Sequence, residues 1–249
     1  MSPYMALLET AHLVKRFGGL LATNDVSITV RAGEIRGLIG PNGAGKTTLV
    51  NLITGIYPPT SGDIRLAGES LVGRKPHEVA RRGLRRTFQV SRLFGNLTVY
   101  ENLLVAYLAH GAEARSDLAA GAARAHEFLD LTGLARLRDL PAKGLSGGQR
   151  ALLQVACGFM APDLKCYVLD EPFAGINPVI KDSIVDLILG ANRSQGITFV
   201  IVSHEMAVMR RLCDRVSVLI DGRVVTEGTL DEVAAKEEVI SAYLGKGWA

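Results

Sequence analysis

The sequence predicts an α/β protein built on a mainly parallel β-sheet. Buried-strand patterns alternate with helical patterns along most of the chain, an order typical of parallel sheets covered by helices. A glycine-rich loop at residues 40–48 also stands between an apolar strand pattern at 34–39 and a helical pattern that begins at 49. With 249 residues, of which 48% are hydrophobic, the chain can form a single domain, residues 1–249, with a full core.

The elements follow in a simple order. Strand patterns at 7–17, 24–30 and 61–68 predict an antiparallel β subdomain near the N-terminus. Helices dominate from about 101 to 161, including an amphipathic helix at 119–131 with Phe128, Leu129 and Leu131 on its apolar side. Later segments predict a helix at 179–192, a strand at 198–203, a helix at 205–213, a hairpin around Asp221-Gly222 and a closing helix at 230–243.

Composition excludes several classes of protein. The formal net charge is only +3, and no aromatic or groove-reading module accompanies the basic residues, so we expect no nucleic-acid partner. No apolar run is long enough to span a membrane, and the N-terminus shows no signal-peptide pattern. The three cysteines lack metal-ligand spacing, and Cys157 and Cys166 lie in apolar runs, so we expect them to be reduced core residues.

The glycine-rich loop carries the first chemical signal. It fits the pattern G-x-x-x-x-G-K-[ST] in strand–loop–helix context, which predicts backbone N–H groups arranged to hold a polyphosphate. Lys46 would neutralise the β- and γ-phosphates, and Thr47 would offer its hydroxyl to Mg²⁺. The predicted nucleotide-binding residues of this loop are Gly40, Pro41, Asn42, Gly43, Ala44, Gly45, Lys46, Thr47 and Thr48.

A second glycine motif follows later in the chain. Ser146, Gly147, Gly148 and Gln149 precede an apolar helical run, and Ser146 suits the N-cap of that helix. Taken alone, the motif is an ordinary helix start. After a phosphate-binding loop, it predicts a second set of N–H groups for the same kind of ligand.

An acidic pair ends the buried-strand pattern at 166–170. Ligands of open α/β sheets bind at the C-terminal ends of strands, so Asp170 is a candidate Mg²⁺ ligand and Glu171 a candidate general base. Two solvated acids at a strand end are the alternative. The glycine-rich loop favours the catalytic interpretation.

Together these motifs resemble an ABC transporter nucleotide-binding subunit. The resemblance covers Phe17 to His204 in the family's motif order and implies a P-loop NTPase (ABC ATPase) core, about 1–88 and 162–249, with an α-helical signature subdomain at about 89–161. It implies that Gln89 senses the γ-phosphate and Mg²⁺, that His204 contacts the γ-phosphate, and that Phe17 stacks on adenine. For Phe17 a core position is an equal alternative, and a lone histidine after a strand is often structural.

The resemblance also implies partners. In the family, two such chains bind ATP head to tail, with residues 40–48 of one chain facing Ser146–Gln149 of the other. We therefore expect ATP and Mg²⁺ as ligands. The expected partners are a second ABC ATPase subunit in a homo- or heterodimer, two transmembrane permease subunits and, indirectly, a solute-binding protein. The chain would then lie peripherally on the cytoplasmic face of the inner (plasma) membrane. The apolar residues Leu93, Phe94 and Leu97 would meet the permease, although Leu97 could equally fill the core.

Segments 12–20, 82–89 and 242–245 resemble the ATPases of branched-chain amino acid importers. Importers of urea and amides, lipopolysaccharide-export ATPases and, less favoured, soluble non-transport ABC ATPases are alternatives. One departure from the family is Ala151-Leu152-Leu153, where polar and basic residues are usual, and it predicts an apolar surface beside the signature. The arginine cluster at 81–86 could face headgroups or acidic residues of a permease, but a solvated basic helix is the favoured interpretation.

Overall fold

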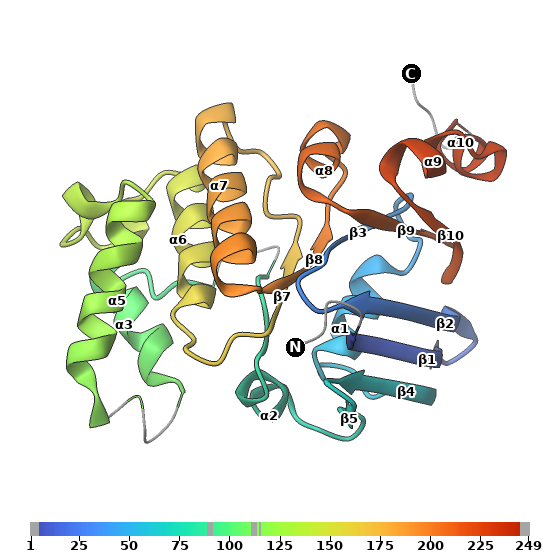
Figure 1. Ribbon diagram of the computed structural model, residues 1–249, viewed down its shortest axis with the longest axis horizontal. Helices are drawn as coiled ribbons and strands as arrows, with labels where there is room; N and C mark the ends of the chain where they lie inside the picture. The colour runs from blue at the N-terminus through green and yellow to red at the C-terminus, as the bar shows by residue number, and fades with distance from the viewer. Residues whose placement is uncertain (1–4, 89–91, 111–113, 115, 245–249) are drawn as a thin grey trace.

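The computed structural model describes residues 5–88, 92–110, 114 and 116–244, and its fold is mixed α/β with two sheets (Figure 1). One sheet has four strands in the order β2-β1-β4-β5. Its strands are antiparallel, as expected for the N-terminal segments. They are β1 (Ala6–Phe17), β2 (Leu20–Arg31), β4 (Ser61–Leu66) and β5 (Glu69–Ser70).

The second sheet has six strands in the order β10-β9-β3-β8-β7-β6. Neighbouring strands run parallel except for the β9–β10 pair. The strands are β3 (Ile35–Ile39), β6 (Leu84–Arg86), β7 (Cys166–Asp170), β8 (Thr198–Val202), β9 (Arg215–Ile220) and β10 (Arg223–Gly228). All residues of β3, β7 and β8 are buried, in agreement with their mainly apolar sequences. Arg36 of β3 is the charged exception, and it pairs with Glu34.

The hairpin between β9 and β10 is confirmed. Asp221 and Gly222 both have positive φ angles, 46° and 77°. This is the backbone that a two-residue turn needs to join right-twisted antiparallel strands, and it explains why Asp-Gly marks the turn in the sequence.

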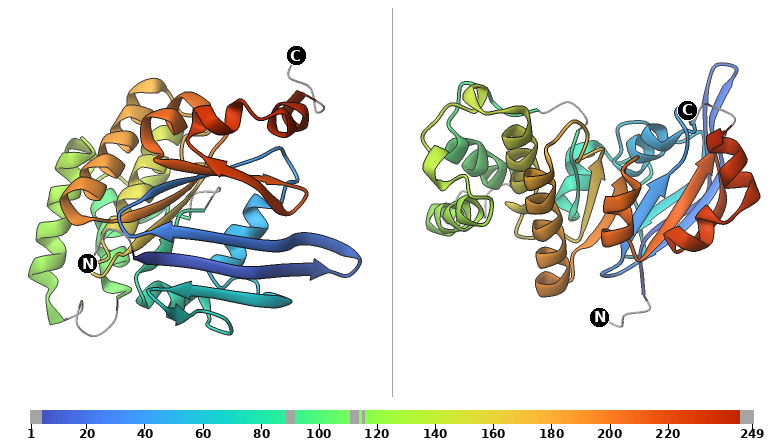
Figure 2. Two further views of the ribbon diagram at one scale, coloured as in Figure 1. Left: turned by 45° about the vertical axis from the view of Figure 1, so that its right-hand side comes forward. Right: turned by 90° about the horizontal axis from the view of Figure 1, so that it is seen from above.

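Three helices lie together at one end of the molecule, away from the antiparallel sheet (Figures 1 and 2). These are α3 (Val99–Leu108), α5 (Leu118–Leu131) and α6 (Gly147–Phe159), and the short 3₁₀ turns η1 (Ala135–Leu137) and η2 (Ala142–Gly144) connect α5 to α6. The remaining helices are α1 (Lys46–Ile53), α2 (Pro76–Arg81), α7 (Pro178–Gln195), α8 (Met206–Leu212), α9 (Leu230–Ala234) and α10 (Glu237–Leu244).

Aromatic side chains join this helical end to the large sheet. The ring of Phe159, at the end of α6, stacks on Phe128 of α5 with centroids 5.6 Å apart and meets Tyr167 of β7 edge-on at 5.2 Å. Gly158 allows this approach, because a Cβ there would lie 2.0 Å from the Tyr167 hydroxyl oxygen. Helix α6 is therefore held directly on the strand that carries Asp170.

Three expectations from the sequence need correction. The closing helix is two helices: α9 ends at Ala234 with Ala235 as its C-cap, and α10 begins separately at Glu237. Leu131 is 58% exposed, although Phe128 and Leu129 are buried as expected. The arginine cluster is not one solvated helix, since α2 ends at Arg81 and the last two arginines belong to strand β6.

No helix in the described ranges is long and apolar enough to cross a membrane. The described cysteines are free; Cys166 is buried and Cys157 is partly buried against the core.

Candidate functional site

The candidate site lies at the C-terminal edge of the six-stranded sheet. The register pairs Leu38 of β3 with Val202 of β8, and Val202 in turn with Asp170 of β7. The loops that follow these three strands begin with Gly40, Glu171 and Ser203, so they leave the sheet side by side. Motifs far apart in the sequence are thereby brought to one edge, as in other open α/β sheets.

Two glycines of the glycine-rich loop allow its backbone to pack closely against neighbouring backbone segments. Gly40 has φ 153°, and a Cβ at this position would lie 2.1 Å from the carbonyl oxygen of Leu219. Gly45 has φ 98°, and its Cβ would lie 2.5 Å from the carbonyl oxygen of Ala22. Any side chain at either position would therefore force the loop away from its neighbours.

Lys46 begins α1 and is only 7% exposed. Its Nζ donates hydrogen bonds to the carbonyl oxygens of Gly40 and Pro41, at 2.7 and 3.0 Å. Burial lowers the pKa of this ammonium, while the carboxylates of Glu171 and Asp170 act in the opposite direction. The carbonyl oxygens of the loop thus hold the Lys46 ammonium in a position where it can bind an anion in the cavity.

Asp170 is the last residue of β7 and is 4% exposed. Its backbone N–H donates to Thr87 Oγ1 at 3.0 Å, and its Oδ2 accepts a hydrogen bond from Arg86 Nη2 at 3.0 Å. Burial raises the pKa of this carboxyl, and the charge and hydrogen bond of Arg86 counteract part of the rise. Arg86 was not singled out from the sequence, because it stood within a run of arginines.

Glu171 has a left-handed backbone, with φ 51°, and its N–H donates to the carbonyl oxygen of Val202 at 2.9 Å. Such a backbone is uncommon for a non-glycine residue and here turns the side chain toward His204. Glu171 Oε1 lies 3.2 Å from His204 Nε2. Burial raises the pKa of Glu171 and lowers the pKa of His204, so the pair favours neutral histidine.

A cavity of about 480 Å³ opens between these motifs. It is lined by three groups of residues: the loop from Asn42 to Thr48, the acidic pair with His204, and a rim of Leu20, Leu21, Ala22, Val202, Asp221 and Gly222. We call it the P-loop cavity. The sequence did not identify the rim residues as site residues, since only the fold brings the start of β2 and the β9–β10 turn to the loop.

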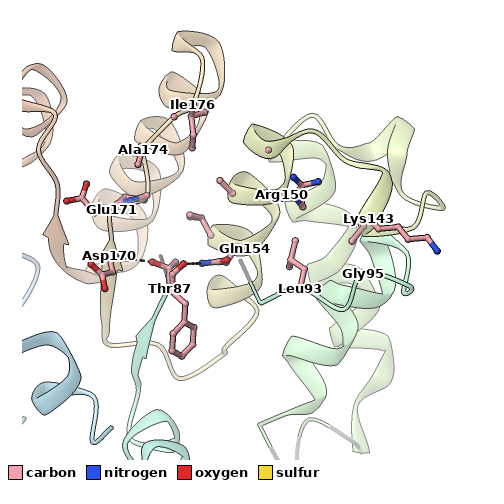
Figure 3. Close-up of a pocket in the computed structure, with 17 residues that line it drawn as sticks. Thr87, Leu93, Gly95, Lys143, Arg150, Gln154, Asp170, Glu171, Ala174 and Ile176 are labelled. Atoms are coloured by element: carbon pink, nitrogen blue, oxygen red, sulfur yellow. Dashed lines mark hydrogen bonds between the residues drawn. The ribbon is translucent and has the colours of Figure 1, made fainter. Parts of the chain in front are cut away.

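A second cavity of about 440 Å³, here the α6 cavity, lies between the acidic pair and α6 (Figure 3). Asp170 and Glu171 line both cavities. The wall of the α6 cavity also includes Gly147, Arg150 and Gln154 of α6. Gln154 Nε2 donates to the carbonyl oxygen of Phe88 at 2.7 Å.

The signature residues form the N-terminus of α6. Ser146 Oγ accepts a hydrogen bond from the Gln149 N–H at 3.2 Å, and Gln149 Oε1 accepts one from the Ser146 N–H at 2.9 Å. This capping box is the ordinary helix start that the sequence also allowed. Ser146, Gly147, Gly148 and Gln149 do not line the P-loop cavity, so this chain does not itself bring the two glycine motifs around one ligand.

The apolar residues after the signature do not form a surface. Leu152 and Leu153 are fully buried in the core of the helical end, and Ala151 is partly buried at the α6 cavity. The expectation of an apolar surface beside the signature is therefore wrong.

Phe17 is not a core residue, because it is 41% exposed. Its ring meets Tyr57 edge-on, with centroids 5.3 Å apart, and Lys15 Nζ lies 4.9 Å from the Phe17 centroid. The ring is thus fixed by a second aromatic and a cation while keeping exposed surface, as a stacking partner for a base requires.

A third hollow of about 340 Å³, here the α3 groove, lies between β6 and α3. Phe88, Arg92, Leu93 and Phe94 line it, and Phe94 is 57% exposed. Leu97 is partly buried and does not line the groove. Gln89, expected in this segment as a sensor and metal ligand, lies outside the described residues.

The oxygen donors of the P-loop cavity fit Mg²⁺. Thr47 supplies a hydroxyl and Asp170 a carboxylate, both hard oxygen ligands, and both residues line the cavity. The described residues contain no cluster of three or more histidine, cysteine or acidic side chains that could form an all-protein metal site.

The fold and this cavity define a P-loop nucleotide-binding protein. Residues 23–174 match the model of the ABC transporter family. The chain therefore belongs to the ABC transporter family, as an ATP-binding domain.

Individual relatives match nearly the whole chain. BraF, a high-affinity branched-chain amino acid transport ATP-binding protein of Pseudomonas aeruginosa, is 38% identical over 253 residues, which cover 96% of this chain and 98% of BraF. The lipopolysaccharide export system ATP-binding protein LptB of Escherichia coli is 35% identical over 247 residues, which cover 97% and 98%.

Solved structures agree with the fold. An ATP-binding cassette of an ABC transporter in its ADP conformation superposes with a TM-score of 0.86 at 31% identity, covering 97% of this chain and 99% of that one. A dimeric cassette in a post-hydrolysis state, bound to ADP and Pi, superposes with a TM-score of 0.78 at 26% identity, covering 90% and 99%.

Proposed function

We propose that this chain is the ATP-hydrolysing subunit of a membrane importer for branched-chain amino acids or a related small polar solute. The observation that carries the proposal is the joint placement of Lys46, Asp170, Glu171 and His204 in one cavity beside an intact glycine-rich loop. The near full-length similarity to BraF supports the choice of cargo.

The cavity suits ATP hydrolysis. The loop N–H groups and Lys46 bind the β- and γ-phosphates, and Phe17 stacks on the adenine. Mg²⁺, held by Thr47 and Asp170, supplies positive charge to the phosphate oxygens. Gln89 is assigned to the same metal and to sensing the γ-phosphate, on the family resemblance.

Glu171 is assigned as the general base. It polarises a water molecule for in-line attack on the γ-phosphate, and general-base catalysis of this kind contributes about 10²–10⁴-fold to a rate. His204 donates its Nε2 hydrogen to Glu171 and orients the carboxylate. Because burial favours the neutral imidazole, the histidine can act as such a donor at neutral pH.

The working unit is proposed to be a dimer. Ser146 to Gln149 lie outside the P-loop cavity, and the capping box uses the N–H groups of Ser146 and Gln149. We therefore assign the N–H groups of Gly147 and Gly148 to a nucleotide bound by another subunit. A dimeric cassette among the similar structures supports this assembly. ATP would join two chains head to tail, hydrolysis would release them, and the change would be passed to two permease subunits served by a solute-binding protein. The partner chain is either a second copy or a related ATPase.

The α3 groove is the proposed permease contact. It exposes Phe94 and the ring of Phe88 beside Arg92, a mixture of apolar and cationic groups that suits a short amphipathic helix. This contact would hold the chain at the cytoplasmic face of the membrane.

Lipopolysaccharide export is the second candidate function, because LptB is similar over almost its whole length. Co-purification from membranes with a tagged chain, followed by mass spectrometry, distinguishes the two. An importer permease pair with a second ABC subunit is the expected result; components of a lipopolysaccharide exporter, or soluble proteins alone, would contradict the import proposal.

Two variants make this experiment specific. Phe94→Ser should abolish recovery of the permease, because it removes an exposed apolar side chain from the groove. Leu131→Ser is the matched control, since Leu131 is exposed to a similar extent on α5 and does not line the groove. Equal recovery with both variants would show that the α3 groove is not the permease contact.

A further inference from the structure

Arg86 forms a buried ion pair with the carboxylate that faces the P-loop cavity. It ends β6, and the β6–β7 register places it opposite Val168, two residues before Asp170. The side chains of Arg86 and Asp170 are 8% and 3% exposed, and Nη2 lies 3.0 Å from Oδ2. The ion pair uses Oδ2 and leaves Oδ1 outside it.

The guanidinium of Arg86 is held by further acceptors at the end of α1 and on the residue that follows Arg86. Nη1 donates to Asn51 Oδ1 at 2.5 Å and to Thr54 Oγ1 at 3.3 Å, at the end of α1. Nε donates to the carbonyl oxygen of Thr87 at 3.0 Å. A planar group with this many fixed acceptors has one orientation, so it also fixes the carboxylate that it binds.

Lysine could not replace these contacts. Its ammonium is a single point of charge on a flexible stem, whereas the arginine fork reaches Asp170 with one nitrogen and α1 with another. The arrangement links the helix that follows the phosphate-binding loop to the strand that carries the acidic pair.

We propose that Arg86 is a positioning residue that holds the Asp170 carboxylate in the orientation in which it binds Mg²⁺ together with ATP. This inference rests on the proposed function, because it assigns Asp170 to the metal. Arg86 does not line the P-loop cavity, so it acts through Asp170, as hydrogen-bond partners behind metal ligands generally do.

The same side chain reaches the α3 groove. The guanidinium carbon of Arg86 lies 4.7 Å from the ring centroid of Phe88, and that of Arg92 lies 4.1 Å from the same ring. Both are within cation–π distance. Phe88 and Arg92 line the groove, so a segment bound there touches a ring that packs on Arg86. One side chain therefore connects the groove to Asp170.

The test measures metal dependence of nucleotide binding rather than turnover. A fluorescent ATP analogue is titrated into the purified chain in EDTA and across a Mg²⁺ series, for the parent, Arg86→Ala and Arg86→Lys. Arg86→Ala should leave binding in EDTA unchanged and raise the Mg²⁺ concentration for half-saturation by about tenfold to a hundredfold, the range for lost partners of metal ligands. Arg86→Lys keeps the positive charge and so protects the fold. Its Mg²⁺ concentration for half-saturation should lie between those of the parent and Arg86→Ala.

Arg82→Ala is the matched control. Arg82 belongs to the same arginine cluster, but its partner is the exposed carboxylate of Glu69, at 3.4 Å. This variant should reproduce the Mg²⁺ dependence of the parent.

The outcomes separate the two proposals. If the parent binds the analogue equally well with and without Mg²⁺, the proposed metal site fails. If the parent depends on Mg²⁺ and both Arg86 variants have its half-saturation point, Arg86 only neutralises a buried charge and the inference is overturned. Phe88→Leu, which keeps bulk but removes the ring face, should shift the half-saturation point in the same direction as Arg86→Ala; no shift would refute the link to the groove.

Discussion

Glu171 Oε1 lies 3.2 Å from His204 Nε2, although the two residues lie in loops that follow different strands. The contact exists because the β7–β8 register places Asp170 opposite Val202 and because Glu171 adopts a left-handed backbone. It brings a candidate base and the group that orients it to one wall of the P-loop cavity.

Replacing the base should stop turnover and keep binding. Glu171→Gln removes the carboxylate but keeps the shape, so ATPase activity should fall by at least about a hundredfold while ATP still binds. Without hydrolysis the ATP-bound dimer should accumulate, and size-exclusion chromatography with ATP measures it. A Gln variant that hydrolyses ATP at the parent rate and stays monomeric would refute the mechanism.

The same variant predicts a pH-dependent stability difference. Burial raises the pKa of Glu171 in the folded chain, so the folded state favours the protonated acid. The folded chain therefore loses stability as the pH rises from the pKa of the unfolded carboxyl to the higher pKa of the folded one. Glu171→Gln carries no such charge. The Tm of this variant relative to that of the parent should therefore rise from pH 5 to pH 8, as measured by thermal unfolding at both pH values. A gap that is larger at pH 5 would contradict the direction of the pKa shift.

Loss of the buried ammonium should weaken phosphate binding. Lys46→Ala removes the cation that the loop holds at the cavity, and a charge-assisted contact of about 1.5–3 kcal/mol corresponds to roughly tenfold or more in Kd. Calorimetry with ATP measures the change. Lys181→Ala is the control, because Lys181 pairs with Glu205 and lies outside the cavity lining.

Stacking on adenine predicts a base-specific effect at Phe17. Phe17→Ala should weaken ATP binding by about tenfold, the lower part of the range for base–aromatic stacking, and Phe17→Tyr should restore it. Inorganic tripolyphosphate has no base, so its affinity should be equal for all three proteins. If Phe17→Ala lowered the affinities for ATP and tripolyphosphate equally, Phe17 would instead stabilise the phosphate-binding loop and would not stack on the base.

Two glycines with opposite roles test the backbone argument. Gly40→Ala puts a Cβ 2.1 Å from the Leu219 carbonyl oxygen and should lower Tm and abolish ATP binding. Gly190→Ala lies in the exposed middle of α7 with open space around the new Cβ, and should stabilise the chain by about 0.5–1 kcal/mol. Thermal unfolding of both variants gives the comparison.

Much of the fold could be predicted because its signals are local. The buried strands, the Asp-Gly hairpin and the glycine-rich loop each depend on a few adjacent residues. The exposure of Leu131 could not be predicted, because burial there depends on where neighbouring elements pack, which periodicity alone does not report. The break in the closing helix could not be predicted either, because it falls at Ala235-Lys236, where no glycine or proline marks a helix end.

The candidate site likewise contains residues that local motifs identify and residues whose role depends on contacts made only in the fold. Lys46, Asp170, Glu171 and His204 stood out by motif, and the structure brings them together. Arg86 did not, since its importance comes from contacts with Asn51 and Asp170 that are remote in sequence. A run of arginines is normally expected to be exposed to solvent. Only the pairing of β6 with β7 shows that the Arg86 side chain is buried beside Asp170.

The position of Asp170 and Glu171 on the shared wall of two cavities has a pharmacological consequence. A small molecule that entered the α6 cavity could touch the acidic pair from the side away from the glycine-rich loop. Such a compound would block turnover without displacing the triphosphate, so raising the ATP concentration would not relieve it. Selectivity against other nucleotide-dependent enzymes would then come from Arg150 and Gln154, not from the phosphate-binding loop that many of them share.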